Sequence, residues 1–280
     1  MYGTPPAPYP RRIVCLTAET TEIAFALGAS DRVVGVSGAA TRPPEAREKP
    51  KVGGFTTFRL DKILALEPDL ALAFSDLQAD IVRDLVRGGV PVLALNQRSL
   101  MGVFQAILLV GGVLGSEERA RGLVADMQEE MRQIREFSSV WPDRPRVYFE
   151  EWDEPPIAGI RWISELIEIA GGQDVFPELR GRSDARGRVV DPAEVVRRAP
   201  QIILASWCGK RVDLEAIRRR PGWESLEAVR EGRLYAVPSA DILAPGPSLL
   251  RGLRTVHDVI PAWMAGEPFK PDITDSETSY

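Results

Sequence analysis

The feature of this sequence that most constrains its fold is a similarity between its two halves. Residues 22–31 match residues 165–174, and both read as the end of a helix that stops at glycine. Residues 63–73 match residues 195–205, and both read as a helix, a proline break and a buried strand. Because the two similarities occur in the same order, they indicate duplication of one α/β unit.

Short apolar runs of strand type alternate with helical patterns through both halves. Such alternation predicts parallel sheets covered by helices, and continuously apolar runs are typical of strands buried on both faces. We therefore predict an α/β fold with two Rossmann-like lobes. The runs are residues 12–16, 32–36, 70–74 and 91–95, followed by 146–149, 201–205 and 233–237.

Residues 116–138 separate the two copies and have the pattern of one long amphipathic helix. Leu123, Met127, Met131 and Ile134 recur at helical spacing, with charged residues between them. A helix of about 22 residues is roughly 33 Å long, enough to bridge two lobes and to hold a ligand cleft between them with limited closure. The expected domains are residues 1–115, the bridging helix 116–138 and residues 139–280, with a flexible tail after about 270.

Composition excludes several classes of protein. The net charge is −5 and the 35 basic residues are scattered, so we expect no nucleic-acid partner. The longest apolar stretch, residues 103–114, is too short to span a membrane. Residues 1–6 lack the basic and apolar regions of a secretory signal, so the chain either is not exported or has lost its leader.

The sequence gives little support for catalysis. It contains no Gly-x-Ser-x-Gly elbow, and Lys210 does not belong to a phosphate loop. His257 is the only histidine, which excludes a metal site with several histidines. Cys15 falls in a strand pattern and Cys208 in a loop pattern; a disulfide between them is left open, and they make no zinc motif. We expect no catalytic residues, no metal and no cofactor.

An acidic segment, residues 150–156, directly follows a predicted strand, where α/β folds place their ligand sites. Its carboxylates could form a catalytic pair or bind a hard cation. We favour a loop that lines a ligand site, because neither a nucleophile nor a histidine accompanies these residues.

Aromatic residues at predicted strand ends and loops suit the capture of a flat ligand. Trp152, Trp162 and Trp207 lie in segments flanked by proline or glycine, and we expect them to face the cleft. Phe55 is a similar candidate in the first half. Phe58 and Trp223 fit core packing better.

The order of these segments resembles the helical-backbone class of substrate-binding proteins of ABC importers, which carry cobalamin, haem and ferric siderophores. The likeness rests on residues 13–16, 21–28, 34–37, 52–55 and 63–70, and it extends over about residues 12–265. It is strongest with the cobalamin-binding members, through residues 151–167 and the tripeptide Trp207-Cys208-Gly209. One departure concerns residues 37–40, Ser-Gly-Ala-Ala, where the well-known corrinoid binders have an aromatic residue.

The resemblance implies a set of site residues. A corrinoid presents a broad apolar face and a rim of amides, which aromatic walls with a few carboxylates would suit. The resemblance also implies one acidic residue on each lobe for docking on the permease: Asp61 on the first, and on the second Glu194, which lies beside the matching Ala193. The implied ligand-binding residues are Phe55, Glu151, Trp152, Trp162, Trp207, Asp241, Ile242 and Leu243.

We therefore expect a monomeric solute-binding protein that captures a corrinoid and delivers it to an ABC permease. One alternative is a cytoplasmic carrier or sensor of a tetrapyrrole, a siderophore or a chelated metal. The other is a chelatase-like enzyme that uses Glu151, Asp153 and His257. The resemblance places the protein in the cell envelope or periplasm, whereas Met1 as the true start would place it in the cytoplasm.

Overall fold

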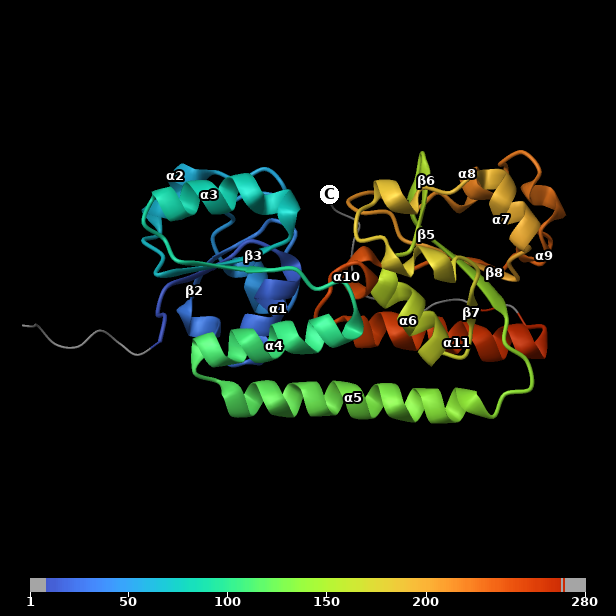
Figure 1. Ribbon diagram of the computed structural model, residues 1–280, viewed down its shortest axis with the longest axis horizontal. Coiled ribbons are helices and arrows are strands. Elements are labelled where there is room, and N and C mark those ends of the chain that lie inside the picture. Colours follow the sequence, from blue (N-terminus) through green and yellow to red (C-terminus); the bar gives the residue numbers. More distant parts are fainter. Residues whose placement is uncertain (1–8, 268, 270–280) are drawn as a thin grey trace, which may run out of the picture. The chain divides into compact units, whose positions relative to one another are not determined.

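Figure 1 shows a computed structural model of the chain, which describes residues 9–267 and 269. The chain forms two compact units, the first ending at Met127 and the second beginning at Gln128. The tail expected after about residue 270 lies outside the described residues.

Unit 1 is built on a parallel four-stranded sheet with the order β2-β1-β3-β4. In Figure 1, α2 and α3 cover one face of this sheet, and α1 and α4 cover the other. The strands are β1 (Ile13–Cys15), β2 (Val33–Val36), β3 (Leu70–Phe74) and β4 (Val92–Leu95), and the helices are α1 (Ala18–Ala26), α2 (Leu60–Ala65), α3 (Ala79–Arg87) and α4 (Leu100–Leu114). The α/β fold class with parallel sheets is thus confirmed.

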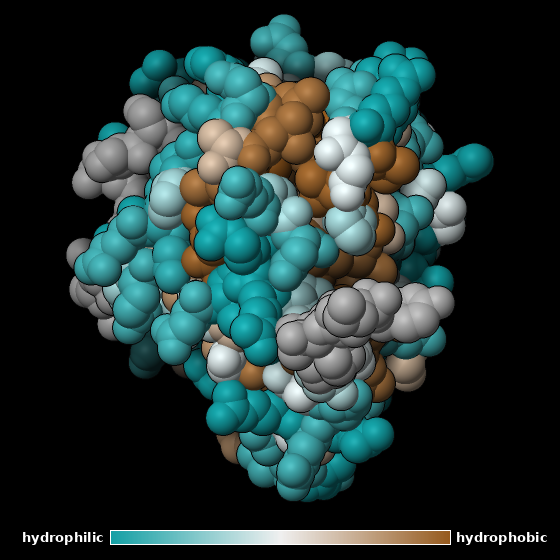
Figure 2. All heavy atoms as spheres, turned by 90° about the vertical axis from the view of Figure 1, so that its left-hand side faces the viewer, coloured by the Kyte–Doolittle hydropathy of each residue, from teal (hydrophilic) through white to brown (hydrophobic). Residues whose placement is uncertain are grey.

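The central strands of unit 1 are buried on both faces. Every residue of β1 and β3 is buried, as the apolar runs predicted. One face of the sheet packs on α2 and α3 through a cluster that includes Val14, Ile63 and Leu85. Figure 2 views the outside of unit 1, where hydrophobic side chains gather among hydrophilic ones; Leu64 of α2 and Val86 of α3 are exposed apolar residues of this unit.

Unit 2 repeats the same strand order. Strands β7 and β8 both pair with β5 in parallel, and β9 pairs with β8 in parallel, so β7-β5-β8-β9 corresponds to β2-β1-β3-β4. Strand β6 is an antiparallel addition to β5. The strands are β5 (Arg146–Asp153), β6 (Pro156–Ala158), β7 (Gln173–Asp174), β8 (Ile202–Ala205) and β9 (Leu234–Ala236), and the helices are α6 (Arg161–Ile169), α7 (Pro192–Arg198), α8 (Leu214–Arg218), α9 (Glu227–Arg230), α10 (Ser239–Ile242) and α11 (Leu249–Ala265).

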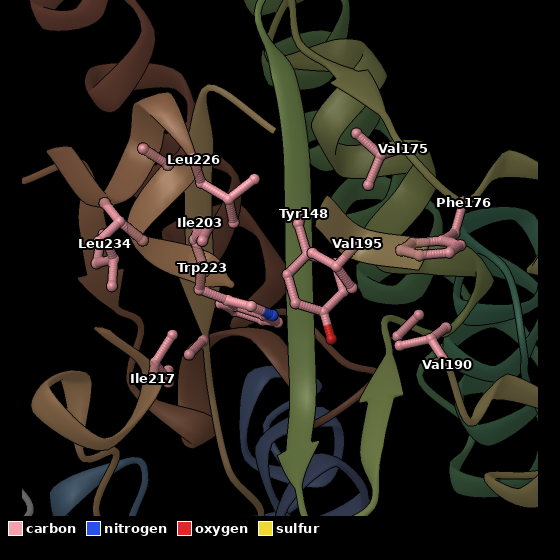
Figure 3. Packing of buried hydrophobic residues seen from close by; sticks show 14 of the residues in the cluster. Tyr148, Val175, Phe176, Val190, Val195, Ile203, Ile217, Trp223, Leu226 and Leu234 are labelled. Atoms are coloured by element: carbon pink, nitrogen blue, oxygen red, sulfur yellow. The ribbon is translucent and has the colours of Figure 1, made fainter. Parts of the chain in front are cut away.

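Aromatic rings dominate the core of unit 2. Tyr148 of β5 lies edge-on to Trp223, at 6.0 Å between ring centroids, and edge-on to Phe176, at 5.7 Å. Figure 3 shows these three rings with the aliphatic side chains around them. Trp223 is fully buried, which confirms its prediction as a core residue. This packing fixes β5 and β8, the strands that lead to the candidate site.

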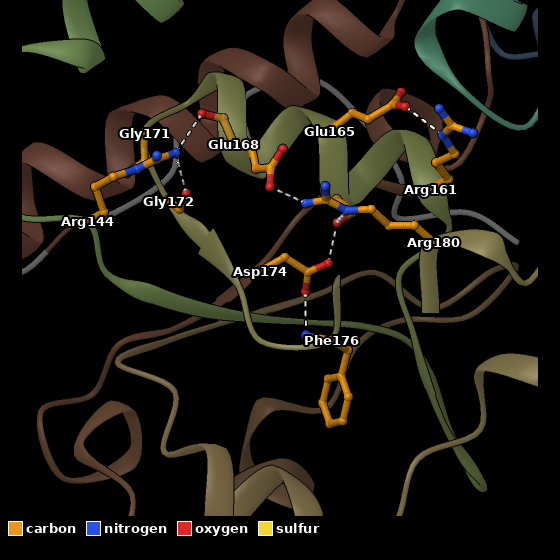
Figure 4. Close-up of polar contacts among 10 residues, drawn as sticks. Arg144, Arg161, Glu165, Glu168, Gly171, Gly172, Asp174, Phe176 and Arg180 are labelled. Carbon is orange, nitrogen blue, oxygen red and sulfur yellow. Dashed lines mark hydrogen bonds and ion pairs between the residues drawn. The ribbon is translucent and has the colours of Figure 1, made fainter. Parts of the chain in front are cut away.

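The duplicated helices end in the same way in both units. Helix α1 is followed by Gly28 with φ 76°, and α6 is followed by Gly171 with φ 96°. Glycine is preferred at such positions because a Cβ is disfavoured in a left-handed backbone. An arginine also donates to the last carbonyls of each helix region: Arg119 to Leu27, and Arg144 to three carbonyls including that of Gly172 (Figure 4).

Helix α5 (Glu117–Ser139) is continuous over 23 residues and passes from unit 1 into unit 2. Its bounds lie one residue from the expected bridging helix. Within the part of the chain that the structure describes, no helix has the length and apolar character needed to span a membrane.

Candidate functional site

The acidic segment of unit 2 lies at the carboxyl end of β5, beside the end of β8. The prediction of a loop over residues 150–153 was wrong, because these residues continue β5 and pair with β6. Trp152 pairs with Ile157 and Asp153 with Pro156, so the chain turns at Glu154 and Pro155. The carboxylates therefore stand on a strand, held by arginines from distant segments.

Glu150 is the most buried of these acidic residues, and the sequence reasoning did not single it out. Its side chain is fully buried and accepts hydrogen bonds from Tyr148 Oη at 3.2 Å, Trp207 Nε1 at 3.2 Å and Arg220 Nη2 at 2.9 Å. Burial raises the pKa of the Glu150 carboxyl, and the paired Arg220 opposes that rise. Each oxygen of the Glu150 carboxylate accepts two hydrogen bonds, so Glu150 holds its neighbours in place and has no acceptor left for a ligand.

Glu151 is also committed to an internal ion pair. Its carboxylate accepts from Arg188 Nη1 at 2.5 Å and from Arg188 Nη2 at 2.9 Å, and the Arg188 side chain is only 3% exposed. Arg188 also donates to the Ala158 carbonyl, and the Ile160 amide donates to Glu151. This network ties β5 and β6 to the segment that precedes α7.

A lysine completes a cluster with two of the expected aromatic residues. Lys210 Nζ lies 4.4 Å from the ring centroid of Trp152 and 4.9 Å from that of Trp207, and 2.6 Å from Asp153 Oδ1. Trp207 is 2% exposed and packs in the core, whereas Trp152 is partly exposed. We call Trp152, Asp153, Trp207 and Lys210 the tryptophan–lysine cluster. Lys210 carried no signal in the sequence, since its partners come from two separate strand ends.

The remaining expected residues of unit 2 come together at a second place. Trp162 of α6 is 4% exposed, and its Nε1 donates to the Ile242 carbonyl at 3.0 Å. Asp241 and Ile242 are buried, and Leu243 is partly exposed. The structure thus joins Trp162 to the 241–243 segment, but little of the side-chain surface of these residues is exposed.

In unit 1, Phe55 is held beside the ends of β1 and β3. Gln78 is almost fully buried, and its Nε2 donates to the carbonyls of Phe55 at 2.9 Å and Leu16 at 3.1 Å. Its Oε1 accepts from the Phe74 amide at 3.0 Å. Phe55 keeps a partly exposed side chain in this fixed loop. Gln78 is a further positioning residue that sequence reasoning missed.

Asp61 and Glu194, the expected docking residues, occupy the first turns of the corresponding helices α2 and α7. Asp61 pairs with Arg59 at 2.9 Å, and Glu194 pairs with Arg198 at 2.7 Å and with Arg197. These arginines lower the pKa of both carboxyl groups, so both are ionised at neutral pH.

The residues named for a chelatase-like site have separate surroundings. His257 of α11 stacks on Trp141, with 5.1 Å between ring centroids, while Glu151 and Asp153 contact Arg188 and Lys210. Cys15 and Cys208 are free thiols, one in each unit. No group of three or more histidine, cysteine or acidic side chains among residues 9–267 and 269 is arranged to hold a metal ion.

Comparison with known proteins gives one family and several relatives. The model of a family described as periplasmic binding protein matches residues 13–240. An uncharacterized ABC transporter substrate-binding lipoprotein of Bacillus subtilis is 28% identical over 90% of this chain and 80% of its own length. A vitamin B12-binding protein of Vibrio cholerae is 27% identical over 89% of each chain.

Solved structures show the same fold. A periplasmic heme-binding protein from Roseiflexus sp. RS-1, in its apo form, has a TM-score of 0.76 and 25% identity, covering 91% of this chain and 98% of its own. The periplasmic vitamin B12-binding protein of Vibrio cholerae has a TM-score of 0.72 and 23% identity with the same coverage.

Proposed function

Because the chain belongs to the periplasmic binding protein family, we propose that it captures a corrinoid and delivers it to an ABC importer. Members of this family are solute-binding transport proteins, and the chain is a solute-binding protein of the type that serves ABC transporters. The corrinoid and the permease are the specific parts of the proposal.

The observation that carries the corrinoid is the likeness to a vitamin B12-binding protein over 89% of both chains. The partly exposed aromatic rings at the sheet ends, Phe55 in unit 1 and Trp152 in unit 2, support it. A corrinoid offers a broad apolar face to such rings. Lys210 lies over the ring of Trp152, so a macrocycle that stacks on that face of the ring displaces the ammonium.

The heme-binding relative from Roseiflexus makes haem the second candidate. Haem iron is commonly held by a protein side chain such as histidine or cysteine. His257 stacks on Trp141, and its Nδ1 is buried, so this nitrogen is not presented at the protein surface. Desolvation and the nearby charge of Glu151 raise the pKa of the Cys208 thiol, which disfavours the thiolate that would bind iron. The cobalt of cobinamide can take water as its axial ligand, so corrinoid binding does not require a protein side chain that coordinates the metal.

Isothermal titration calorimetry with cobinamide and cyanocobalamin tests the proposal. We expect binding by the wild-type protein and at least about tenfold weaker binding by Trp152→Ala, because stacked aromatic surface is lost. Phe137→Ala is the matched control, since Phe137 is an exposed aromatic residue of α5 outside the proposed site. Heat released by hemin and by neither corrinoid would overturn the corrinoid proposal and leave the solute-binding family unaffected.

The proposal includes docking on a permease through Asp61 and Glu194. Each is an ionised carboxylate in the first turn of a duplicated helix, so the two units present similar acidic groups. Cationic side chains on a permease would complement them.

A further inference from the structure

Unit 1 contains a buried carboxyl group with an unused acceptor. Glu19 is the second residue of α1, and its side chain is 3% exposed. Its Oε1 is buried and has no hydrogen-bond partner among the described residues. Leaving a buried polar oxygen without a partner is costly, so such an atom in a native fold calls for a physical reason.

The position of Glu19 in the fold supplies that reason. The strand order β2-β1-β3-β4 reverses direction between β1 and β3, with α1 and α3 on opposite faces of the sheet (Figure 1). Open α/β sheets bind ligands outside the carboxyl ends of the strands at such a reversal. Glu19 lies four residues after the end of β1, in the first turn of the helix that follows this strand.

Two neighbouring features mark the same edge of the sheet. Ser75, which follows β3, has φ 64° although it is not glycine, and backbone strain of this kind clusters at ligand sites. Gln78 fixes the loop of Phe55 to the ends of both strands. Glu19 therefore shares its sheet edge with Phe55, the aromatic residue of unit 1 that is proposed to bind the ligand.

The duplication gives Glu19 a counterpart in unit 2. Helix α6 corresponds to α1, and its second residue is Trp162, where α1 has Glu19. Trp162 is one of the residues implied for ligand binding. At equivalent positions the two units thus carry an aromatic ring and a carboxyl group.

Among the described residues, the four elements with the most contacts to α1 bring no cationic side chain to Glu19. These elements are β1, β2, β3 and α4, and their one titratable residue is Cys15. Burial raises the pKa of Cys15 to about 12, so its thiol is neutral, and the other acidic residue of α1 is Glu22. Burial raises the pKa of Glu19 to about 7, and the charge of Glu22 adds to the rise.

We propose that Glu19 determines ligand specificity by accepting an N–H bond from a side-chain amide of the corrinoid and by disfavouring macrocycles that carry carboxylates. A carboxylate oxygen only accepts hydrogen bonds, so it is satisfied by an amide donor. A propionate of haem would instead place a second negative charge beside it. This inference rests on the proposed corrinoid function and assigns a chemical basis for the choice between corrinoid and haem.

The test compares cobinamide with its monocarboxylate derivatives, in which one side-chain amide has been hydrolysed. Calorimetry is done at pH 8 and pH 6 on the wild type, Glu19→Gln and Glu19→Ala. Glu118→Gln is the control, because Glu118 is also the second residue of a helix in unit 1 but is exposed. Thermal unfolding of each variant establishes that it is folded.

We expect the wild type to bind cobinamide about tenfold or more tightly than at least one monocarboxylate isomer at pH 8. At pH 6 Glu19 is protonated and can donate to the ligand carboxylate, so this preference should shrink. Glu19→Gln should show a reduced preference at both pH values, and Glu118→Gln should behave as the wild type.

Two results overturn the inference in distinguishable ways. If the wild type binds cobinamide but shows no preference for it over any monocarboxylate isomer, the role of Glu19 is wrong and the corrinoid function stands. The same conclusion follows if Glu19→Gln prefers cobinamide over each isomer as strongly as the wild type does. If the wild type binds hemin at pH 8 and does not bind cobinamide, both the role of Glu19 and the corrinoid function are wrong.

Discussion

Buried carboxyl groups of this protein differ in how they are satisfied, and that difference separates structural from ligand-binding roles. Glu150 accepts bonds from Tyr148, Trp207 and Arg220, and all of these partners are side chains of unit 2. Glu19 leaves one oxygen unused at the edge of the sheet of unit 1. A satisfied carboxylate holds strands together, whereas an unsatisfied one is available to a donor that arrives with the ligand.

The ion pair between Arg188 and Glu151 should be a main support of unit 2. We expect Arg188→Ala to lower the free energy of unfolding by roughly 3 kcal/mol, because it leaves the partly buried Glu151 carboxylate without its partner. Denaturant unfolding measures the change. Arg186→Ala, at an exposed position two residues earlier, is the control and should change stability by about 0.5 kcal/mol or less. Equal effects of the two substitutions would refute the assignment.

Glu19 should make the stability of the ligand-free protein depend on pH. Its pKa rises from 4.5 to about 7 on folding, so the folded state holds the proton more tightly than the unfolded state. The contribution of Glu19 to the free energy of unfolding is therefore greatest below about pH 4.5, and it falls by roughly 3 kcal/mol as the pH rises to about 7. Denaturant unfolding should show a larger loss in the wild type than in Glu19→Gln, because only Glu150 and Asp174, whose pKa values are also raised, keep this kind of pH dependence in the variant. A difference between them that does not change with pH would contradict the account.

At the level of single residues, the sequence identified many relevant positions but not their partners. Trp152 and Phe55 are partly exposed at sheet ends, which suits their expected role. Trp162 and Trp207 are buried, and their indole N–H groups donate to the Ile242 carbonyl and the Glu150 carboxylate. These bonds join segments far apart in the chain, so no local pattern could reveal them. The ligand roles of all four residues stay predictions.

At the level of elements, the glycines that follow the corresponding helices α1 and α6 allow the same substitution to be compared at two positions of one molecule. In Gly28→Ala the added Cβ would meet the end of the flexible Arg119 side chain, whereas in Gly171→Ala it would lie 2.7 Å from the Trp141 ring and 2.8 Å from Ser138 Cβ. We expect a loss of about 1 kcal/mol for Gly28→Ala and a larger loss, roughly 2 kcal/mol or more, for Gly171→Ala. Chemical denaturation measures both. The reverse order would show that packing around Gly171 is looser than described.

The first turns of α2 and α7 carry the proposed docking residues. We expect Asp61→Lys and Glu194→Lys to reduce cobinamide uptake by cells of the native host, each about tenfold, because the charge presented to the permease is reversed. Cobinamide affinity in calorimetry should be unchanged. Glu118→Lys, an exposed charge reversal on α5, is the control. Normal uptake with both docking variants would remove these residues from the interface with the permease.

Most elements could be predicted from sequence because their strands are short apolar runs between helix patterns. The ends of β1, β3 and β8 lie within one residue of expectation. The strands missed are the short β6 and β7 and the second half of β5, where acidic residues suggested a loop. Arg220 and Arg188 neutralise Glu150 and Glu151 there, and β6 supplies backbone partners. Charge compensation from distant arginines therefore allows a strand where local composition argues against one.

At the scale of the whole molecule, two α/β units share one strand order in their parallel sheets. Unit 2 also has strand β6 and the tryptophan–lysine cluster, and unit 1 has a four-stranded sheet with the carboxyl group of Glu19 at its edge. The central claim is that this solute-binding protein selects a corrinoid.

Native mass spectrometry of the ligand-free protein mixed with equimolar cobinamide and hemin tests that claim most directly. The account predicts a single dominant complex whose added mass is that of one cobinamide, with little hemin adduct. A dominant hemin complex, with cobinamide left unbound, would contradict it.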